Sequence, residues 1–260
     1  MFDLPAYLAR LRLSARPTRD AAGLQALHRA HRLAIPFENL DLGLGRPIAI
    51  DPAAAFAKLV GRPRGGYCFE HHRVFADALA ALGFSARPLL ARVLLGAAAP
   101  PPLTHVLSLV RMDGQDWIAD PGFGDGYTPP MPLAEGEEAT ATDGARFALT
   151  REGADWTLWR DGDGDDPRPQ YRFTLASVED ADLEQGNWWA STHPTSRFTR
   201  HRIASIVLPH GFARLTDRHY RRQVGVEISE GEIADPRVYR MRLSLLFGID
   251  LTAEEVAQLF

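Results

Sequence analysis

The sequence contains very little cysteine: Cys68 is the only one among 260 residues. A single cysteine cannot form an intramolecular disulfide, and no second cysteine is present to complete a zinc site with the nearby His71 and His72. We therefore expect no bound metal. Two interpretations of Cys68 remain, a buried structural cysteine and a reactive thiol, and the residues around it must decide between them.

The sequence also lacks a long apolar run and a large excess of either charge. No segment predicts a membrane-spanning helix, and the first residues lack the basic region and apolar stretch of a secretory signal, so we expect no membrane association and a cytoplasmic location. The formal net charge of −4 argues against broad nucleic-acid binding. The basic stretch 197–202 is either a solvated surface or a contact for the phosphates of a nucleotide cofactor.

The composition has an ordinary soluble balance: 45% hydrophobic and 24% charged residues can form one large core or two to three smaller ones. Residues 1–84 show helical spacing, residues 85–190 alternate with period two, and residues 191–260 combine an alternating run with a final helix. We predict an α+β fold with an N-terminal helical bundle, a central β domain and a C-terminal α/β lid. No long linker separates these parts, so we expect the functional site where they meet.

Cys68 follows two glycines and opens a run with helical spacing, Arg64-Gly65-Gly66-Tyr67-Cys68-Phe69-Glu70. This pattern predicts a thiol at a helix N-terminus. At that position, unpaired backbone N–H groups and the helix dipole favour the thiolate over the thiol. The local sequence therefore favours a nucleophile.

A β-hairpin is predicted between residues 105 and 120. Two apolar-alternating runs, 105–112 and 115–120, are separated by an Asp-Gly dipeptide, which is typical of a two-residue hairpin turn. Counting back from such a turn places Leu109 opposite Ile118. A bulge or a longer loop would change the faces on which the later residues lie.

The same register brings His105 and Asp120 together. His105 falls opposite Gly122, and His105 and Asp120 are diagonal neighbours on one face, with Cβ atoms roughly 7 Å apart. The Asp120 carboxylate can then accept a hydrogen bond from Nδ1–H of His105, and Gly122 leaves space around the ring. Together with Cys68 these residues predict a triad of nucleophile, base and orienting acid.

The remaining histidines near these motifs favour packing over chemistry. His28 and His31 lie one helical turn apart, which indicates a packed or solvated helix face. His71 and His72 follow Cys68 closely, but helical spacing directs them away from the thiol or beside it. We therefore leave these four residues out of the predicted triad.

Three blocks carry a resemblance that runs nearly end to end. The blocks are Ile35-Pro36-Phe37-Glu38-Asn39-Leu40, Arg64-Gly65-Gly66-Tyr67-Cys68-Phe69-Glu70 and Asp120-Pro121-Gly122-Phe123-Gly124. With them the sequence resembles the bacterial arylamine N-acetyltransferases. The resemblance implies that Cys68 carries the acetyl group, His105 activates the thiol and Asp120 orients His105. It also implies a cysteine-peptidase-like core of the papain and transglutaminase kind, with an antiparallel β-barrel-like central domain.

Glu38 and Arg64 lie within two of these blocks, and we predict a structural ion pair. An arginine fork can bind one carboxylate in bidentate fashion and pin the turn that presents Cys68. Direct chemistry by either residue is unnecessary once a triad is present.

The resemblance further implies contacts with coenzyme A and an acceptor. Thr104, Gly124 and Gly126 are expected to line the approach of the cofactor. Aromatic residues are candidates for apolar walls that favour a flat amine, with core packing as the alternative: Phe37, Tyr67, Phe123 and Phe198.

Two positions depart from the family pattern, and neither removes a triad member. Pro121 stands where a small aliphatic residue is common, and His72 stands where Asn is usual. Because His72 follows the nucleophile motif, the departures bear on substrate preference.

The implied reaction is ping-pong acyl transfer. Acetyl-CoA acetylates Cys68, coenzyme A leaves, and an arylamine, hydrazine or arylhydroxylamine takes the acetyl group. The same triad also fits a cysteine hydrolase or transglutaminase-like enzyme and a macrolactam-forming amide synthase with a carrier-bound donor. A catalytically silent binding module is a further alternative, which predicts slow, unselective alkylation of Cys68 and no acyl transfer. The sequence leaves open the physiological acceptor, the choice among acetyl, propionyl and malonyl donors, and whether the protein is a monomer or a homodimer.

Overall fold

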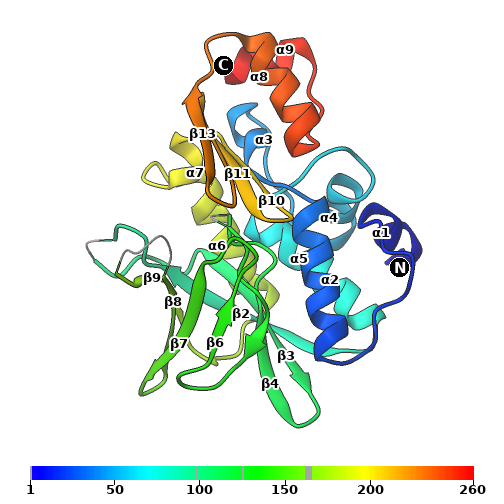
Figure 1. Ribbon diagram of the computed structural model, residues 1–260, viewed down its shortest axis with the longest axis vertical. Helices are drawn as coiled ribbons and strands as arrows, with labels where there is room; N and C mark the ends of the chain where they lie inside the picture. The colour runs from blue at the N-terminus through cyan, green and yellow to red at the C-terminus, as the bar shows by residue number, and fades with distance from the viewer. Residues whose placement is uncertain (1, 98, 125, 162–165) are drawn as a thin grey trace.

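The computed structural model describes residues 2–97, 99–124, 126–161 and 166–260. Its first part is helical, as expected (Figure 1). The first, second and fourth helices are each N-capped by an aspartate, whose side chain accepts a backbone N–H of the first turn. The helices are α1 (Leu4–Arg10), α2 (Ala21–Ala34), α3 (Leu40–Gly43), α4 (Pro52–Leu59) and α5 (Cys68–Ala81).

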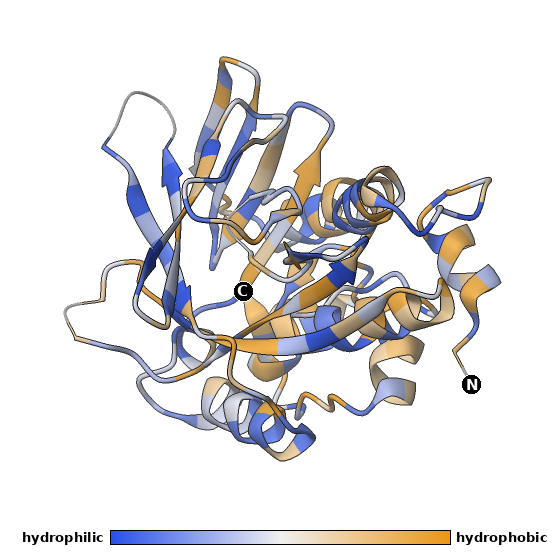
Figure 2. Ribbon diagram, turned by 90° about the horizontal axis from the view of Figure 1, so that it is seen from below, coloured by the Kyte–Doolittle hydropathy of each residue, from blue (hydrophilic) through white to orange (hydrophobic). Residues whose placement is uncertain are grey.

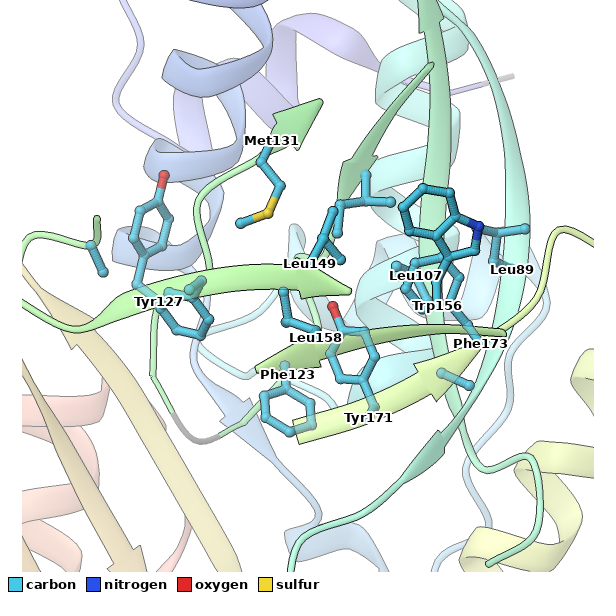
Figure 3. Packing of buried hydrophobic residues seen from close by; sticks show 14 of the residues in the cluster. Leu89, Leu107, Phe123, Tyr127, Met131, Leu149, Trp156, Leu158, Tyr171 and Phe173 are labelled. Carbon is cyan, nitrogen blue, oxygen red and sulfur yellow. The ribbon is translucent and has the colours of Figure 1, made fainter. Parts of the chain in front are cut away.

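The central part forms an antiparallel, barrel-like sheet of eight described strands, in the order β5-β4-β3-β2-β9-β8-β7-β6. Its inward-facing side chains, which include Leu107, Leu158 and Phe173, form one buried cluster (Figure 3). The strands are β2 (Ser85–Val93), β3 (His105–Met112), β4 (Gln115–Ala119), β5 (Met131–Pro132), β6 (Glu138–Thr140), β7 (Arg146–Glu152), β8 (Asp155–Asp161) and β9 (Arg168–Phe173).

The predicted hairpin is confirmed as β3 and β4. Leu109 pairs with Ile118, as the two-residue turn requires. Asp113 and Gly114 both have positive φ, 48° and 82°, which is the type I′ geometry of tight hairpins. The described pairs end at Ser108 and Ala119, so Asp120 lies just beyond the strand, at the start of a loop.

A second antiparallel sheet has the order β1-β10-β11-β12-β13. In β11, buried residues alternate with partly exposed ones. Seen from below, the ribbon carries both hydrophobic and hydrophilic stretches on its helices and strands (Figure 2). These strands are β1 (Phe37–Glu38), β10 (Ile203–Leu208), β11 (Gly211–Thr216), β12 (His219–Val224) and β13 (Glu227–Glu232). The helices of the second half are α6 (Asp180–Thr192), α7 (Arg197–Arg200), α8 (Pro236–Arg242), the π-helix η1 (Leu243–Phe247) and α9 (Ala253–Leu259).

The second sheet joins segments that are distant in the sequence. Phe37 pairs with Ser205 and Glu38 with Ala204, so β1 from the N-terminal part forms its edge. The sequence boundaries at residues 84 and 190 therefore stay a proposal, because a strand from the first part completes a sheet of the last. Over the described residues, none of the helices has the length and apolar character needed to cross a membrane.

Candidate active site

Cys68 is the first residue of α5, as its glycine-rich approach predicts. Its side chain is 2% exposed, and the sulfur lies 3.6 Å from the backbone oxygen of Thr104. Glu70 fixes this helix start, because its Oε2 accepts the Tyr67 N–H at 3.0 Å while Lys58 binds its Oε1 at 2.8 Å. The thiol is thus held at a capped helix N-terminus.

The predicted contact between Glu38 and Arg64 is confirmed, but the bidentate geometry is wrong. Nε of Arg64 donates to Glu38 at 2.8 Å, and Nη2 donates to Asp41 at 2.8 Å. One guanidinium therefore bridges two carboxylates, and Glu38 also accepts the Gly65 N–H at 3.3 Å. Burial opposes the charge of Arg64, but the two carboxylates outweigh it and raise its pKa. The turn before Cys68 is pinned by this network.

His105 and Asp120 meet as the hairpin register predicts, although through a different ring nitrogen. Nε2 of His105 donates to Oδ2 of Asp120 at 2.7 Å, and both side chains are buried. The sequence had favoured Nδ1. The ring is turned so that Nε2 faces Asp120 at the start of the loop after β4, and His105 also interacts with the Cys68 side chain.

The charges of His105 and Asp120 stabilise each other. Burial alone would lower the pKa of His105, but the Asp120 carboxylate and the Cys68 side chain outweigh burial and raise it. For Asp120 burial raises the pKa, and His105, the Gly122 N–H and the Tyr171 hydroxyl together lower it below its usual value. The geometry thus favours an imidazolium beside a carboxylate.

Tyr171 on β9 is a residue that the sequence analysis missed. Its ring centroid lies 5.1 Å from that of His105 and 5.2 Å from that of Phe123. Figure 3 shows the rings of Tyr171 and Phe123 side by side. Period-two alternation in β9 was the available signal, but it does not show which face meets the triad. Tyr171 packs behind the imidazole and holds its orientation.

Gly122, which the sequence analysis expects to leave space around His105, lies against Cys68. A Cβ on Gly122 would lie 2.7 Å from Cα of Cys68. Its N–H donates to Oδ1 of Asp120 at 3.0 Å. The glycine therefore allows the loop after β4 to touch the backbone of Cys68.

A cavity of about 140 Å³ opens at Cys68 and His105. Its lining includes Phe37, Phe123 and Phe198, the expected acceptor walls, and Thr104 and Gly124, the expected cofactor contacts, and these contact roles stay predictions. Arg197, from the basic stretch 197–202, also lines the cavity. Further lining residues come from β2, α6 and β10 and from positions next to β2 and α7, and the sequence analysis did not indicate them: Val93, Leu95, Trp189, Ala190, Ser196 and Ile203.

Two predicted contact residues lie outside this cavity lining. The Tyr67 ring is buried against the edge of Phe198, 5.3 Å between centroids, and its hydroxyl donates to the side chain of Asn187. The Gly126 carbonyl instead accepts a hydrogen bond from Arg32 at 2.9 Å. Tyr67 therefore supports the wall from behind, because the capped turn directs its ring into the core.

His28, His31, His71 and His72 are buried, which confirms packing for His28 and His31. His31 and His71 are 2.7 Å apart between Nε2 and Nδ1, and Nε2 of His71 donates to the Pro36 carbonyl at 3.1 Å. His72 lies 3.3 Å from the Ser108 hydroxyl, and burial lowers its pKa to about 3, so it is neutral. Among the residues with described positions, no group of three or more His, Cys, Asp or Glu is arranged to hold a metal ion.

Relatives with this sequence pattern are known. A family model described as N-acetyltransferase matches residues 20–256. The arylamine N-acetyltransferase / N-hydroxyarylamine O-acetyltransferase of Salmonella typhimurium is 38% identical over 258 residues, covering 95% of this chain and 88% of that protein. The arylamine N-acetyltransferase of Mycolicibacterium smegmatis is 41% identical over 212 residues, covering 79% and 76%.

Solved structures share the fold. The Salmonella typhimurium arylamine N-acetyltransferase superposes with a TM-score of 0.93 at 34% identity, covering 98% of this chain and 97% of that one. The Mycobacterium marinum enzyme in complex with CoA gives 0.91 at 30% identity, covering 99% and 98%. These matches confirm the expected α+β fold with a cysteine-peptidase-like core. The chain therefore belongs to the arylamine N-acetyltransferases, a family of acyltransferases.

Proposed function

We propose that the protein transfers an acetyl group from acetyl-CoA to arylamines, hydrazines or arylhydroxylamines through an acetyl-Cys68 intermediate. The observation that carries this proposal is the meeting of Cys68 and the His105–Asp120 pair at the wall of one apolar cavity. The Mycobacterium marinum relative bound to CoA supports coenzyme A as the donor.

In the donor half-reaction the sulfur of Cys68 attacks the thioester carbonyl of acetyl-CoA. His105 stabilises the attacking thiolate as an imidazolium, and Asp120 holds the ring through Nε2. The backbone N–H of Cys68, at the start of α5, is placed to stabilise the oxyanion. The bond from the carbonyl carbon to the sulfur of coenzyme A then breaks, and His105 returns a proton to that sulfur.

In the acceptor half-reaction the amine nitrogen attacks the acetyl carbonyl of Cys68. His105 takes the amine proton, and the bond between the carbonyl carbon and the Cys68 sulfur breaks. A cavity of about 140 Å³ suits one aromatic ring, since an apolar protein cavity of about 150 Å³ binds benzene. Phe37, Phe123 and Phe198 provide apolar contacts for that ring.

The intact mass of the protein after incubation with acetyl-CoA tests this proposal. We expect a gain of one acetyl group that is absent in Cys68→Ser. A second incubation adds an arylamine, which should return the protein to its original mass and yield the acetylated amine.

Other outcomes would assign the site differently. Acetylation followed by equally fast loss in water alone would favour the hydrolase alternative. No acetylation of a folded protein would refute acetyl-CoA as donor, and acylation by a carrier-bound thioester would then favour the amide synthase alternative.

A further inference from the structure

Arg32 on α2 is a buried cation close to the active site. Its side chain is among the largest fully buried ones, with the residue 2% exposed. Burial lowers its pKa to about 10, and the negative charge of Asp120 opposes that shift, so the guanidinium stays protonated at neutral pH. Burying a charge costs free energy, and a fold retains it only where hydrogen bonds or opposite charge compensate.

The hydrogen bonds of Arg32 converge on the loop that follows Asp120, of which the structure describes residues 121–124 and 126. Nη1 donates to the Pro121 carbonyl at 3.1 Å, and Nη2 donates to the carbonyls of Phe123 and Gly126, each at 2.9 Å. A planar guanidinium presents its donors in a fixed fork, so three carbonyls held at once define the position of the loop. A lysine ammonium keeps the charge but not this geometry.

This loop touches both the nucleophile and the acceptor wall. A Cβ on Gly122 would lie 2.7 Å from Cα of Cys68, and one on Gly124 would lie 2.9 Å from the Phe37 ring. The loop begins at Asp120, and the Gly122 N–H donates to that carboxylate. Any movement of the loop therefore moves the acid of the triad and the contact with Cys68 together.

A residue of a second element, Ser205 on β10, also binds this loop. The Ser205 hydroxyl on β10 donates to the Gly124 carbonyl at 2.6 Å. Arg32 and Ser205 thus fix one segment from two elements that are far apart in the sequence. Of the two, Arg32 makes more bonds and is more deeply buried.

We propose that Arg32 is a positioning residue that, assisted by Ser205, holds the loop after Asp120 in the geometry that acyl transfer requires. This inference rests on the proposed function, because it assigns Arg32 a role in the acetylation of Cys68. Arg32 touches no reacting atom and acts through the loop carbonyls. Catalysis depends on such placement, since a misplacement of about 1 Å can cost about 100-fold in rate.

Arg32→Lys tests the role, with Arg29→Lys as the matched control. Arg29 lies on the same helix and contacts the Pro209 carbonyl at the surface. Mass spectrometry at the end point of acetylation gives the fraction of protein molecules whose Cys68 can be acetylated. We call these molecules competent sites and express kcat per competent site. We also measure the rate of Cys68 alkylation by iodoacetamide as a function of pH, because a change in stability alone would leave this pH profile unchanged.

We expect Arg32→Lys to lower kcat per competent site by about 100-fold. It should also shift the alkylation profile to higher pH, because a displaced Asp120 supports the imidazolium less well. Arg29→Lys should leave both unchanged. A variant that melts earlier but keeps the wild-type kcat and alkylation profile would show that Arg32 serves stability only.

Ser205→Ala keeps the test decisive if Arg32→Lys fails to fold. It removes one loop tether, so we expect the same direction of change with a smaller loss of kcat. A folded Ser205→Ala with the wild-type profile would contradict the proposal. Failure of the proposed function is distinguishable, because the wild-type protein would then not be acetylated while alkylation would still compare the variants.

Discussion

Replacing Gly122 by Ala tests how closely the Asp120 loop must approach the nucleophile. The added methyl group would lie 2.7 Å from Cα and 3.0 Å from O of Cys68. Both atoms belong to the backbone at the start of α5, so they cannot swing away as a flexible side chain would. The loop and the helix must separate instead, and Gly122 also carries the N–H that binds Asp120.

The size of the effect follows from these distances. The two carbons must separate by about 0.7 Å to reach the 3.4 Å of ordinary contact. A shift of this size should lower kcat by about 10- to 100-fold. Overpacking should lower the free energy of unfolding by about 1–3 kcal/mol, which lowers Tm by about 2–4 °C per kcal/mol.

Rapid-quench mass spectrometry of the acetylated enzyme measures the rate, and thermal melting measures stability. Gly231→Ala is the matched control, because a Cβ there meets no atom within 4 Å and its backbone is not left-handed. We expect the control to retain the wild-type rate. A folded Gly122→Ala that is acetylated as fast as the wild type would refute the inference that this contact places Cys68.

Further predictions concern the triad and its surroundings. Asp120→Asn should lower kcat by about 10⁴-fold, because an amide facing Nε2 favours the tautomer with its proton on Nδ1; a rate within tenfold of wild type would contradict this. Because folding raises the pKa of His105, its stabilising effect is full below about pH 6.5 and is lost as pH rises toward the folded value. Urea unfolding should therefore show the advantage of wild type over His105→Gln shrinking with increasing pH, whereas a constant difference would count against the pair. His71→Leu removes the partner of the Pro36 carbonyl and of His31, so the free energy of unfolding should fall by about 1–3 kcal/mol in urea, and an equally stable variant would disprove that contribution.

Local patterns predicted the triad because each of its parts depends on short-range physics. A two-residue turn sets the register of β3 and β4, and that register brings His105 to Asp120. Two glycines before a helical run place Cys68 at a helix N-terminus. In both cases the deciding interactions lie within about 15 residues of one another.

Residues brought in from distant segments escaped prediction. Arg32 meets the Phe123 carbonyl across 91 positions of the chain, and Trp189 and Ile203 reach the cavity from α6 and β10. At Tyr67 the core-packing alternative describes the structure, because its ring is buried against Phe198 and is not part of the cavity lining. Periodicity shows that a face is buried but does not show what it is buried against.

The amino-acid sequence by itself determined that Cys68 begins a helix and that His105 meets Asp120, because turn chemistry and strand alternation act between near neighbours. Only the tertiary structure decided which nitrogen of His105 meets Asp120 and which residues line the cavity. It also decided that Arg32 donates hydrogen bonds to the loop beside Cys68. These outcomes depend on how helices and sheets pack against one another, which is determined by the burial of side chains from the whole chain at once.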